Sequence, residues 1–239
     1  MLTEQRGSSA VSWSKGTKHR FYEDRYRILS REIPLVASKK IGELFAVFDG
    51  IGSAPRGMAS AQEMADNLVN FFRETESTPT SVKGLLDLLM RTNIKVYHWG
   101  FMPVTDRPLG GCAGTIAWIC RNRLTIFYAG DTTAILIRDG KATELTRPHQ
   151  TPDGAIFRYF GLGDSLNIDV DEYEVEESDR ILLLSDGVTK VMHPIDAAEF
   201  TEQYLDVSRA ADALATRTRN LGATDDITVL LVQIDEIWE

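Results

Sequence analysis

Residues 112–145 read CAGTIAWICRNRLTIFYAGDTTAILIRDGKATEL, and this stretch decides the fold class. Apolar side chains recur in it at every second position, as at Leu124, Ile126 and Tyr128, and a period of two is typical of β-strands. Asp139–Gly140 separates two such runs and favours a tight hairpin, because both central residues of a type I′ turn need positive φ. The stretch therefore predicts an antiparallel meander.

The flanking sequence adds helices and further strands in separate blocks. Apolar residues at spacings of three and four predict two helical stretches, from Met58 to Phe72 and from Val82 to Trp99. Further strands are predicted at 26–29, 44–48, 181–184 and 227–234, and further helices around 196–204 and 208–221. Strands that cluster with strands favour an α+β domain over a doubly wound α/β domain. Because no repeat or linker divides the chain, we expect one domain over residues 1–239, with its core at about 16–234.

Composition and charge exclude several classes of protein. The chain has 239 residues, 43% of them apolar, so it is long enough to fold without disulfides, and any metal would be functional. Its 26 Lys plus Arg against 35 Asp plus Glu give a net charge of −9, which argues against nucleic acid or an anionic membrane as partner. There is no basic segment followed by an apolar one at the N-terminus and no apolar run of bilayer length, so we expect a cytoplasmic protein.

The two cysteines indicate core thiols. Cys112 and Cys120 are separated by about 26 Å if they lie in one strand, which is too far for a disulfide. Neither lies in a loop that could cradle a phosphate, and an apolar strand does not favour a reactive thiolate.

Acidic residues flank apolar strand segments at five places, usually beside a glycine. They are Glu23–Asp24, Asp49–Gly50, Gly130–Asp131, Asp186–Gly187 and Asp225–Asp226. A carboxylate at the end of a buried strand is held rigidly but loses solvation, and several that converge repel one another. Divalent cations relieve both effects, and oxygen-only sets without His or Cys select Mg²⁺ or Mn²⁺. Each pair alone is most simply a turn, whereas the five together predict a metal centre.

Six segments in a fixed order carry a family resemblance. They are ED at 23–24, FAVFDGIG at 45–52, GGCAGTIAW at 110–118, YAGDTTAIL at 128–136, ILLLSDGVT at 181–189 and DDITVLLV at 225–232. Together they resemble the metal-dependent protein phosphatases of the PPM (type 2C) class, in their bacterial stand-alone form, over nearly the whole chain. The ending Asp-Asp-x-Thr also occurs in the related sporulation and stress-regulator phosphatases, and the Glu23–Asp24 start favours the ordinary type.

The resemblance implies a fold, an activity and partners. The implied fold is a two-sheet antiparallel β-sandwich flanked by helices on both sides, with a metal centre for two Mn²⁺ or Mg²⁺ ions at one end. The implied activity is hydrolysis of phosphoserine and phosphothreonine esters in proteins by a water that the two cations activate, without a protein nucleophile. We expect phosphoprotein substrates and an opposing Ser/Thr kinase.

The same resemblance implies a role for single residues of the metal centre. Asp49 would bridge both metals and would be the central catalytic ligand. Asp186 and Asp225 would complete one metal, and Glu23 with the carbonyl of Gly50 would serve the other.

Further residues of the centre follow from the same motifs. Asp131 would help to hold a weaker third metal, Asp24 would orient water without binding metal directly, and Asp226 would make supporting contacts. The phosphate-binding arginine of the family falls on His19 here, and Arg20 is one place nearer to the Glu-Asp pair. We expect Arg20 to be the catalytic phosphate-binding residue, with His19 as the second choice, because an Arg fork binds a phosphoryl group bidentately.

Two departures from the family pattern concern the active site. Many members have His directly after the Asp-Gly pair as a proton donor, and this chain has Ile51. The segment after the meander, 146–163, is shorter than the usual flap, so we expect more open access to the metals. His149 within it could be a catalytic acid, but a lone histidine there is more simply a surface loop residue.

These departures leave two alternatives to a protein serine/threonine phosphatase. One is a catalytically impaired phosphatase-like binding or regulatory module, which Ile51 and His19 suggest. The full set of carboxylates speaks against it, because such a module needs no repulsive acidic cluster. The other is a metal-dependent hydrolase of small phosphate esters, which a comparison of phosphopeptide with small-ester turnover would separate.

Overall fold

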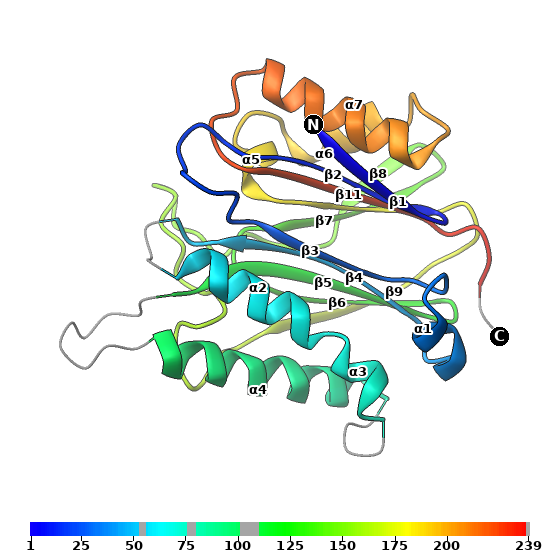
Figure 1. Ribbon diagram of the computed structural model, residues 1–239. Coiled ribbons are helices and arrows are strands. Elements are labelled where there is room, and N and C mark those ends of the chain that lie inside the picture. Colours follow the sequence, from blue (N-terminus) through cyan, green and yellow to red (C-terminus); the bar gives the residue numbers. More distant parts are fainter. Residues whose placement is uncertain (53–55, 76–79, 101–109, 238–239) are drawn as a thin grey trace.

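Two antiparallel β-sheets lie face to face, and helices cover the outer face of each (Figure 1). The computed structural model describes residues 1–52, 56–75, 80–100 and 110–237. The first sheet has the strand order β1-β2-β11-β10-β7-β8, with β1 Leu2–Arg6, β2 Ser9–Ser14, β11 Ile227–Gln233, β10 Arg180–Leu184, β7 Thr133–Arg138 and β8 Lys141–Glu144. The second has the order β3-β4-β5-β6-β9, with β3 Arg25–Leu29, β4 Glu43–Gly50, β5 Cys112–Cys120, β6 Arg123–Ala129 and β9 Asp169–Glu174.

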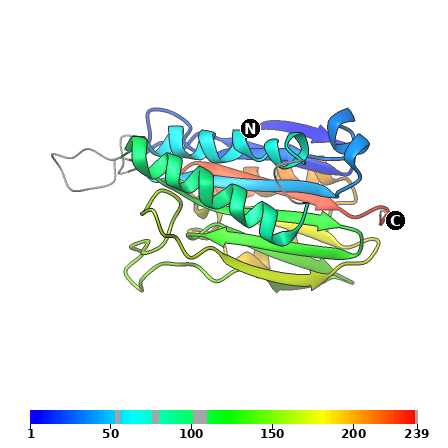
Figure 2. The same ribbon diagram turned by 90° about the horizontal axis from the view of Figure 1, so that it is seen from below.

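The helices form the two outer layers of the molecule. Against the second sheet lie α2 Gly57–Asn67, α3 Asn70–Arg73 and α4 Val82–Gly100, with α2 and α4 side by side (Figure 2). Against the first sheet lie α5 Asp186–Thr189, α6 Pro194–Thr201 and α7 Val207–Asn220. The short helix α1, Pro34–Lys39, connects β3 and β4 and packs near α3. The α+β class and the sandwich flanked by helices on both sides are confirmed.

Three layers of apolar side chains hold these elements together. In β4, Leu44, Ala46 and Phe48 face the helices, whereas Phe45 and Val47 face the opposite sheet. Successive side chains of a strand point to opposite faces, so a strand covered on both sides needs apolar residues at every position. This is why LFAVF and ILLL are continuous apolar runs instead of alternating ones.

The predicted meander is only partly correct. Its first hairpin, β5–β6, belongs to the second sheet and its second hairpin, β7–β8, belongs to the first. The chain therefore crosses between the sheets at 130–132, because alternation along a strand does not specify which sheet the strand joins. The turn at Asp139–Gly140 has positive φ at both residues, 50° and 73°, as the sequence predicts.

Two other elements differ from the sequence prediction. The N-terminal hairpin β1–β2 was not predicted, and Ala10 and Val11 in it are fully buried, so the core begins before residue 16. The helical stretch 58–72 is interrupted between α2 and α3, next to Asn67, whose side chain donates to the carbonyl of Glu63. Asparagine competes in this way with regular helix hydrogen bonding. Among the described residues, no helix is both long and apolar enough to span a bilayer.

Candidate metal centre

Five chain segments meet at one end of the sandwich. β4 ends at Asp49–Gly50, β3 begins after Glu23–Asp24, and β11 begins after Asp225–Asp226. Asp186 begins α5 close behind the end of β10, and Asp131 lies in the crossing from β6 to β7. Because antiparallel neighbours begin and end alternately at one edge, these strands bring their acidic ends together although they are far apart in sequence.

A cleft of about 630 Å³ opens at this end. Its lining includes every predicted metal ligand, namely Glu23, Asp49, Gly50, Asp131, Asp186 and Asp225. It also includes four basic side chains, Lys18, His19, Arg20 and Lys190. Gln150, Gly154 and Ile156 of the short segment after β8 border it as well. The structure therefore brings the predicted ligands and both predicted phosphate-binding residues to one cleft.

The carboxyl groups of this cleft are strongly perturbed. Burial, reinforced by the charge of Asp186, raises the pKa of Asp49 well above its ordinary value. Burial and Asp186 likewise raise the pKa of Asp131 to about 7. Both shifts disfavour the ionised form, and a cation bound among these groups would reverse them.

The donor set fits a divalent cation. Oδ1 of Asp131 is buried and has no hydrogen-bond partner among the described residues, whereas nearly all buried polar atoms have one. The other predicted donors are carboxylates and the backbone carbonyl of Gly50, a residue that lines the cleft. Oxygen donors of this kind suit Mg²⁺ and Mn²⁺.

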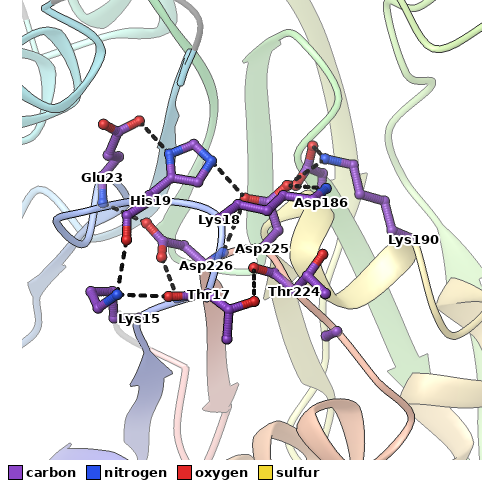
Figure 3. A network of polar contacts seen from close by, with 12 residues as sticks. Lys15, Thr17, Lys18, His19, Glu23, Asp186, Lys190, Thr224, Asp225 and Asp226 are labelled. Atoms are coloured by element: carbon purple, nitrogen blue, oxygen red, sulfur yellow. Dashed lines mark hydrogen bonds and ion pairs between the residues drawn. The ribbon is translucent and has the colours of Figure 1, made fainter.

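Two side chains of the protein itself stand between the carboxylates (Figure 3). Nζ of Lys190 lies 2.5 Å from Oδ2 of Asp186 and 2.9 Å from Oδ2 of Asp225. Nδ1 of His19 lies 2.9 Å from Oε2 of Glu23, and its Nε2 lies 3.3 Å from Oδ1 of Asp225. Within the described part of the chain, no three His, Cys, Asp or Glu side chains form a group that could hold a metal ion as they stand. A cation that used these same oxygens would displace Lys190 and His19 from them.

Lys190 was not predicted from the sequence. Burial lowers its pKa, but the carboxylates of Asp186 and Asp225 outweigh burial and raise that pKa above its ordinary value. The same contacts hold the pKa of Asp225 below its ordinary value, although burial acts in the opposite sense. The signal in the sequence was the spacing of four from Asp186 to Lys190, which places the two side chains on one face of a helical turn.

Asp226 and Asp24 hold the loop that carries Glu23. Asp226 accepts hydrogen bonds from the backbone N–H groups of Gly16 and Glu23, each at 2.6 Å. Oγ1 of Thr228 donates to Oδ2 of Asp24 at 2.6 Å, and burial raises the pKa of Asp24 to about 8. Neither carboxylate lines the cleft. Both lie behind the predicted ligands, where they can support the loop of Glu23 without binding a metal directly.

Arg20 lies at the rim of the same cleft. It is exposed, and its guanidinium carbon lies 5.2 Å from the centroid of the Phe21 ring. This cation–π contact orients the guanidinium without using its hydrogen-bond donors. His19, by contrast, is engaged with two carboxylates, so the structure leaves Arg20 as the more accessible phosphate-binding candidate.

His149 is not the surface loop residue that the sequence suggests. Its side chain is 7% exposed, and Nδ1 accepts a hydrogen bond from the backbone N–H of Gly130 at 3.1 Å. Nε2 lies 3.0 Å from Oδ2 of Asp169, and the ring stacks on Tyr128. Burial lowers its pKa below 6.5, which favours the neutral imidazole. His149 thus holds the backbone directly before Asp131, and the prediction failed because all of these partners are distant in sequence.

The cysteines do not supply a nucleophile. Cys112 and Cys120 are free, and burial raises the pKa of both thiols. A raised thiol pKa disfavours the reactive thiolate, as the sequence predicts.

Comparison with known proteins decides the family. The model of the family described as Stage II sporulation protein E (SpoIIE) matches residues 43–235, which is most of the chain. The chain belongs to the SpoIIE and type 2C (PPM) phosphatase family. The resemblance inferred from the six motifs is confirmed.

Relatives of this phosphatase include bacterial serine/threonine phosphatases. The "Serine/threonine phosphatase stp" of Listeria monocytogenes is 22% identical over 212 residues, which are 79% of this chain and 83% of that protein. Among solved structures, PppA, described as a key regulatory component of T6SS in Pseudomonas aeruginosa, has a TM-score of 0.80 at 22% identity and covers 97% of this chain and 99% of that one. The catalytic domain of PstP in complex with two manganese ions has a TM-score of 0.78 at 21% identity, over 95% and 98% of the two chains.

These comparisons confirm the expected class of activity. The curated relative carries the name of a serine/threonine phosphatase, and the PstP structure of the same fold contains two manganese ions. The family match begins at residue 43 and does not include Glu23–Asp24, the pair that favours the ordinary type over the sporulation type. The matched Listeria relatives carry the name "Serine/threonine phosphatase stp".

Proposed function

We propose that the cleft hydrolyses phosphoserine and phosphothreonine esters of proteins, with Glu23, Asp49, Gly50, Asp186 and Asp225 as the ligands of two divalent cations. Asp131 would contribute to a third. The observation that carries this assignment is the convergence of these groups on one cleft, with Oδ1 of Asp131 buried and unpartnered among the described residues.

The protein's own residues would divide the work as follows. Divalent cations, when bound, supply a water of lowered pKa and positive charge for the phosphoryl oxygens. Arg20, at the rim, binds the phosphoryl group through its guanidinium fork. Asp24 and Asp226 keep the loop with Glu23 in place through the hydrogen bonds described above. Ile51 lines the cleft and cannot donate a proton, so the leaving oxygen would take its proton from water or from another residue.

The test is turnover of a phosphothreonine peptide with Mn²⁺, with Mg²⁺ and with chelator. We expect metal-dependent turnover that Asp49→Asn abolishes while the fold remains, because the substitution removes a buried charge that its neighbours repel. Circular dichroism and thermal melting of Asp49→Asn in chelator are the control for folding. Unchanged turnover in Asp49→Asn would contradict the site assignment.

A second candidate function is a phosphatase-like binding module without turnover. Lys190 and His19 favour it, because the ammonium of Lys190 neutralises carboxylate charge without a metal and the ring of His19 contacts Glu23. Measurable Mn²⁺ binding without turnover of any phosphate ester would select this alternative. Turnover of p-nitrophenyl phosphate but of no phosphopeptide would instead indicate a hydrolase of small esters.

The setting of the enzyme also belongs to this proposal. We propose that residues 1–239 act as one catalytic domain in signalling, on phosphoproteins that a Ser/Thr kinase modifies. The cytoplasmic location and the absence of nucleic acid and membrane partners stay predictions from the sequence.

A further inference from the structure

A second concave surface adjoins the metal centre. It has a volume of about 850 Å³ and follows β3, with Arg6 and Trp13 in one wall and Met58 and Arg73 in the other. We call it the β3 groove. In Figure 1, β3 lies between β1 and β2 above and α2 below.

The β3 groove runs along the edge of the strand. All five consecutive residues of β3, Arg25–Leu29, line it. Successive side chains of a strand point to opposite faces, so a groove that contacts every residue follows the backbone edge and not one face. β3 is the edge strand of its sheet and pairs only with β4 in the described structure. The outward N–H and C=O groups of such an edge can pair with an added strand.

The charge of the β3 groove is opposite to that of the protein. Its lining has four arginines, Arg6, Arg25, Arg27 and Arg73, and one acidic residue, Glu4. The whole chain has a net charge of −9. An acidic ligand is therefore repelled by most of the surface and attracted here.

Two of the arginines are not fully paired within the described part of the chain. Nε of Arg27 is buried without a hydrogen-bond partner in the described part of the chain, and its NH1 is 3.5 Å from Asp66. Arg73 is exposed, and no acidic group of the described residues lies within ion-pair distance of it. Arg6 and Arg25, by contrast, are engaged with Glu4 and with Gln62.

The β3 groove and the catalytic cleft share one chain segment. His19, Arg20 and Glu23 line the cleft, whereas Phe21 and Tyr22 line the groove. The cleft and the groove therefore lie next to each other at the junction of Arg20 and Phe21. The five residues of β3 span about 13 Å at strand rise, enough for an extended segment of about five residues.

We infer that the β3 groove binds an extended acidic segment of the phosphoprotein substrate, next to the phosphorylated residue, as an added strand on β3. This inference rests on the proposed function, since it names the class of substrate for that site. It gives specificity to a cleft whose own residues recognise only the phosphoryl group.

The test compares phosphothreonine peptides of one core sequence. One set carries five Glu or Asp residues on the N-terminal or C-terminal side, and the other carries Gln or Asn at the same positions. We expect kcat/KM with Mn²⁺ to be about five- to tenfold higher for an acidic extension, and Arg27→Gln and Arg73→Glu each to reduce this preference at least twofold. Turnover of p-nitrophenyl phosphate should be unchanged. Arg209→Glu, an exposed arginine at the start of α7, is the matched control.

Several results would overturn the inference. One is an equal kcat/KM for acidic and neutral extensions. Another is a preference for acidic extensions that survives Arg73→Glu, a substitution at an exposed position outside the core. The inference would also fail if the wild-type protein forms a dimer and binds no acidic peptide, and if Arg73→Glu dissociates that dimer. The groove would then be a contact between two copies of the chain. If no phosphate ester is hydrolysed, the proposed function fails, and fluorescence anisotropy of a labelled, unphosphorylated acidic peptide still tests the groove. Binding weakened by Arg73→Glu but not by Arg209→Glu would support it, and no binding would overturn it.

Discussion

Nζ of Lys190 lies 2.5 Å from Oδ2 of Asp186, one helical turn earlier in the chain. The same ammonium contacts Asp225, so one positive charge of the protein serves two proposed metal ligands. Metal binding is then an exchange of cations and not a simple addition. The concentration of metal needed for activity depends on how strongly Lys190 holds these oxygens.

Lys190→Ala should therefore bind Mn²⁺ more tightly than the wild type. The Lys190 side chain is half exposed, which limits the strength of its ion pairs, so we expect a gain of about three- to tenfold in affinity. Isothermal titration calorimetry at fixed ionic strength measures it. Lys141→Ala, at an exposed hairpin turn far from the cleft, controls for the change in net charge. Equal or weaker binding by Lys190→Ala would show that the lysine helps to hold the metal instead of competing with it.

Gly187→Ala should damage the same end of the sandwich by steric overlap. A Cβ at Gly187 would lie 1.8 Å from the carbonyl oxygen of Asp226, so α5 or the loop before β11 must move. We expect a loss of about 2–4 kcal/mol in the free energy of unfolding, measured by urea denaturation. Gly163→Ala, where an added Cβ meets no atom within 4 Å, is the control and should change stability little. Wild-type stability in Gly187→Ala would mean that this contact is looser than described.

The metal-free protein should lose stability as the pH rises from 6.5 to 8.5. The pKa values of Asp131 and Asp24 are raised from 3.8 to about 7 and about 8 in the folded state. The stability from their protonated forms is full below pH 3.8 and is lost as the pH rises through the folded-state values. We expect a loss of about 1–3 kcal/mol across this window.

Urea denaturation in chelator at each pH measures this loss. Saturating Mn²⁺ should weaken the pH dependence, because the cation stabilises the ionised carboxylates. His149 contributes little to this comparison, since burial lowers its pKa and favours the neutral imidazole. Stability in chelator that is constant or rises with pH would contradict the predicted perturbation of the two carboxyl groups.

His149→Ala should weaken both the fold and the metal site. The substitution leaves the buried N–H of Gly130 without an acceptor, which costs about 1–3 kcal/mol, and frees the backbone before Asp131. His149→Asn can place an amide oxygen near the position of Nδ1 and should recover part of the loss. Urea denaturation and Mn²⁺ titration of both variants measure the effect. If His149→Asn and His149→Ala have the same stability and the same Mn²⁺ affinity, the hydrogen bond to Gly130 does not determine either property.

The strands of this fold were largely predictable, because a strand that is buried on both faces consists mostly of apolar residues. A segment such as LFAVFDG, residues 44–50, is apolar on both faces and ends in a carboxylate, so it predicts a covered strand with a functional end. The β1–β2 hairpin was missed, because Leu2–Arg6 is a mostly exposed edge strand with polar residues at most positions. The position of this strand in the sheet is determined by its pairing with other segments and not by an alternation of apolar residues in its own sequence.

The metal centre was predictable in its ligands but not in their neighbours. Motifs at strand ends placed all six predicted ligands in one cleft. The contacts of Lys190, His19 and His149 depend on side-chain directions and on which strand follows which across the two sheets. The crossing at 130–132 is the clearest case, since it places Asp131 at the cleft and the alternation of apolar residues does not reveal it.

The first sheet joins the two ends of the chain. β2 pairs with β11, and Asp226 binds the backbone of Gly16 and Glu23, which lie more than 200 positions earlier. During synthesis on the ribosome, β2 can pair with β1, but residues 9–24 lack their partners in β11 and at Asp226 until the last strand has emerged. The active centre is completed only when translation is nearly finished, so a nascent or truncated chain that lacks β11 remains catalytically silent.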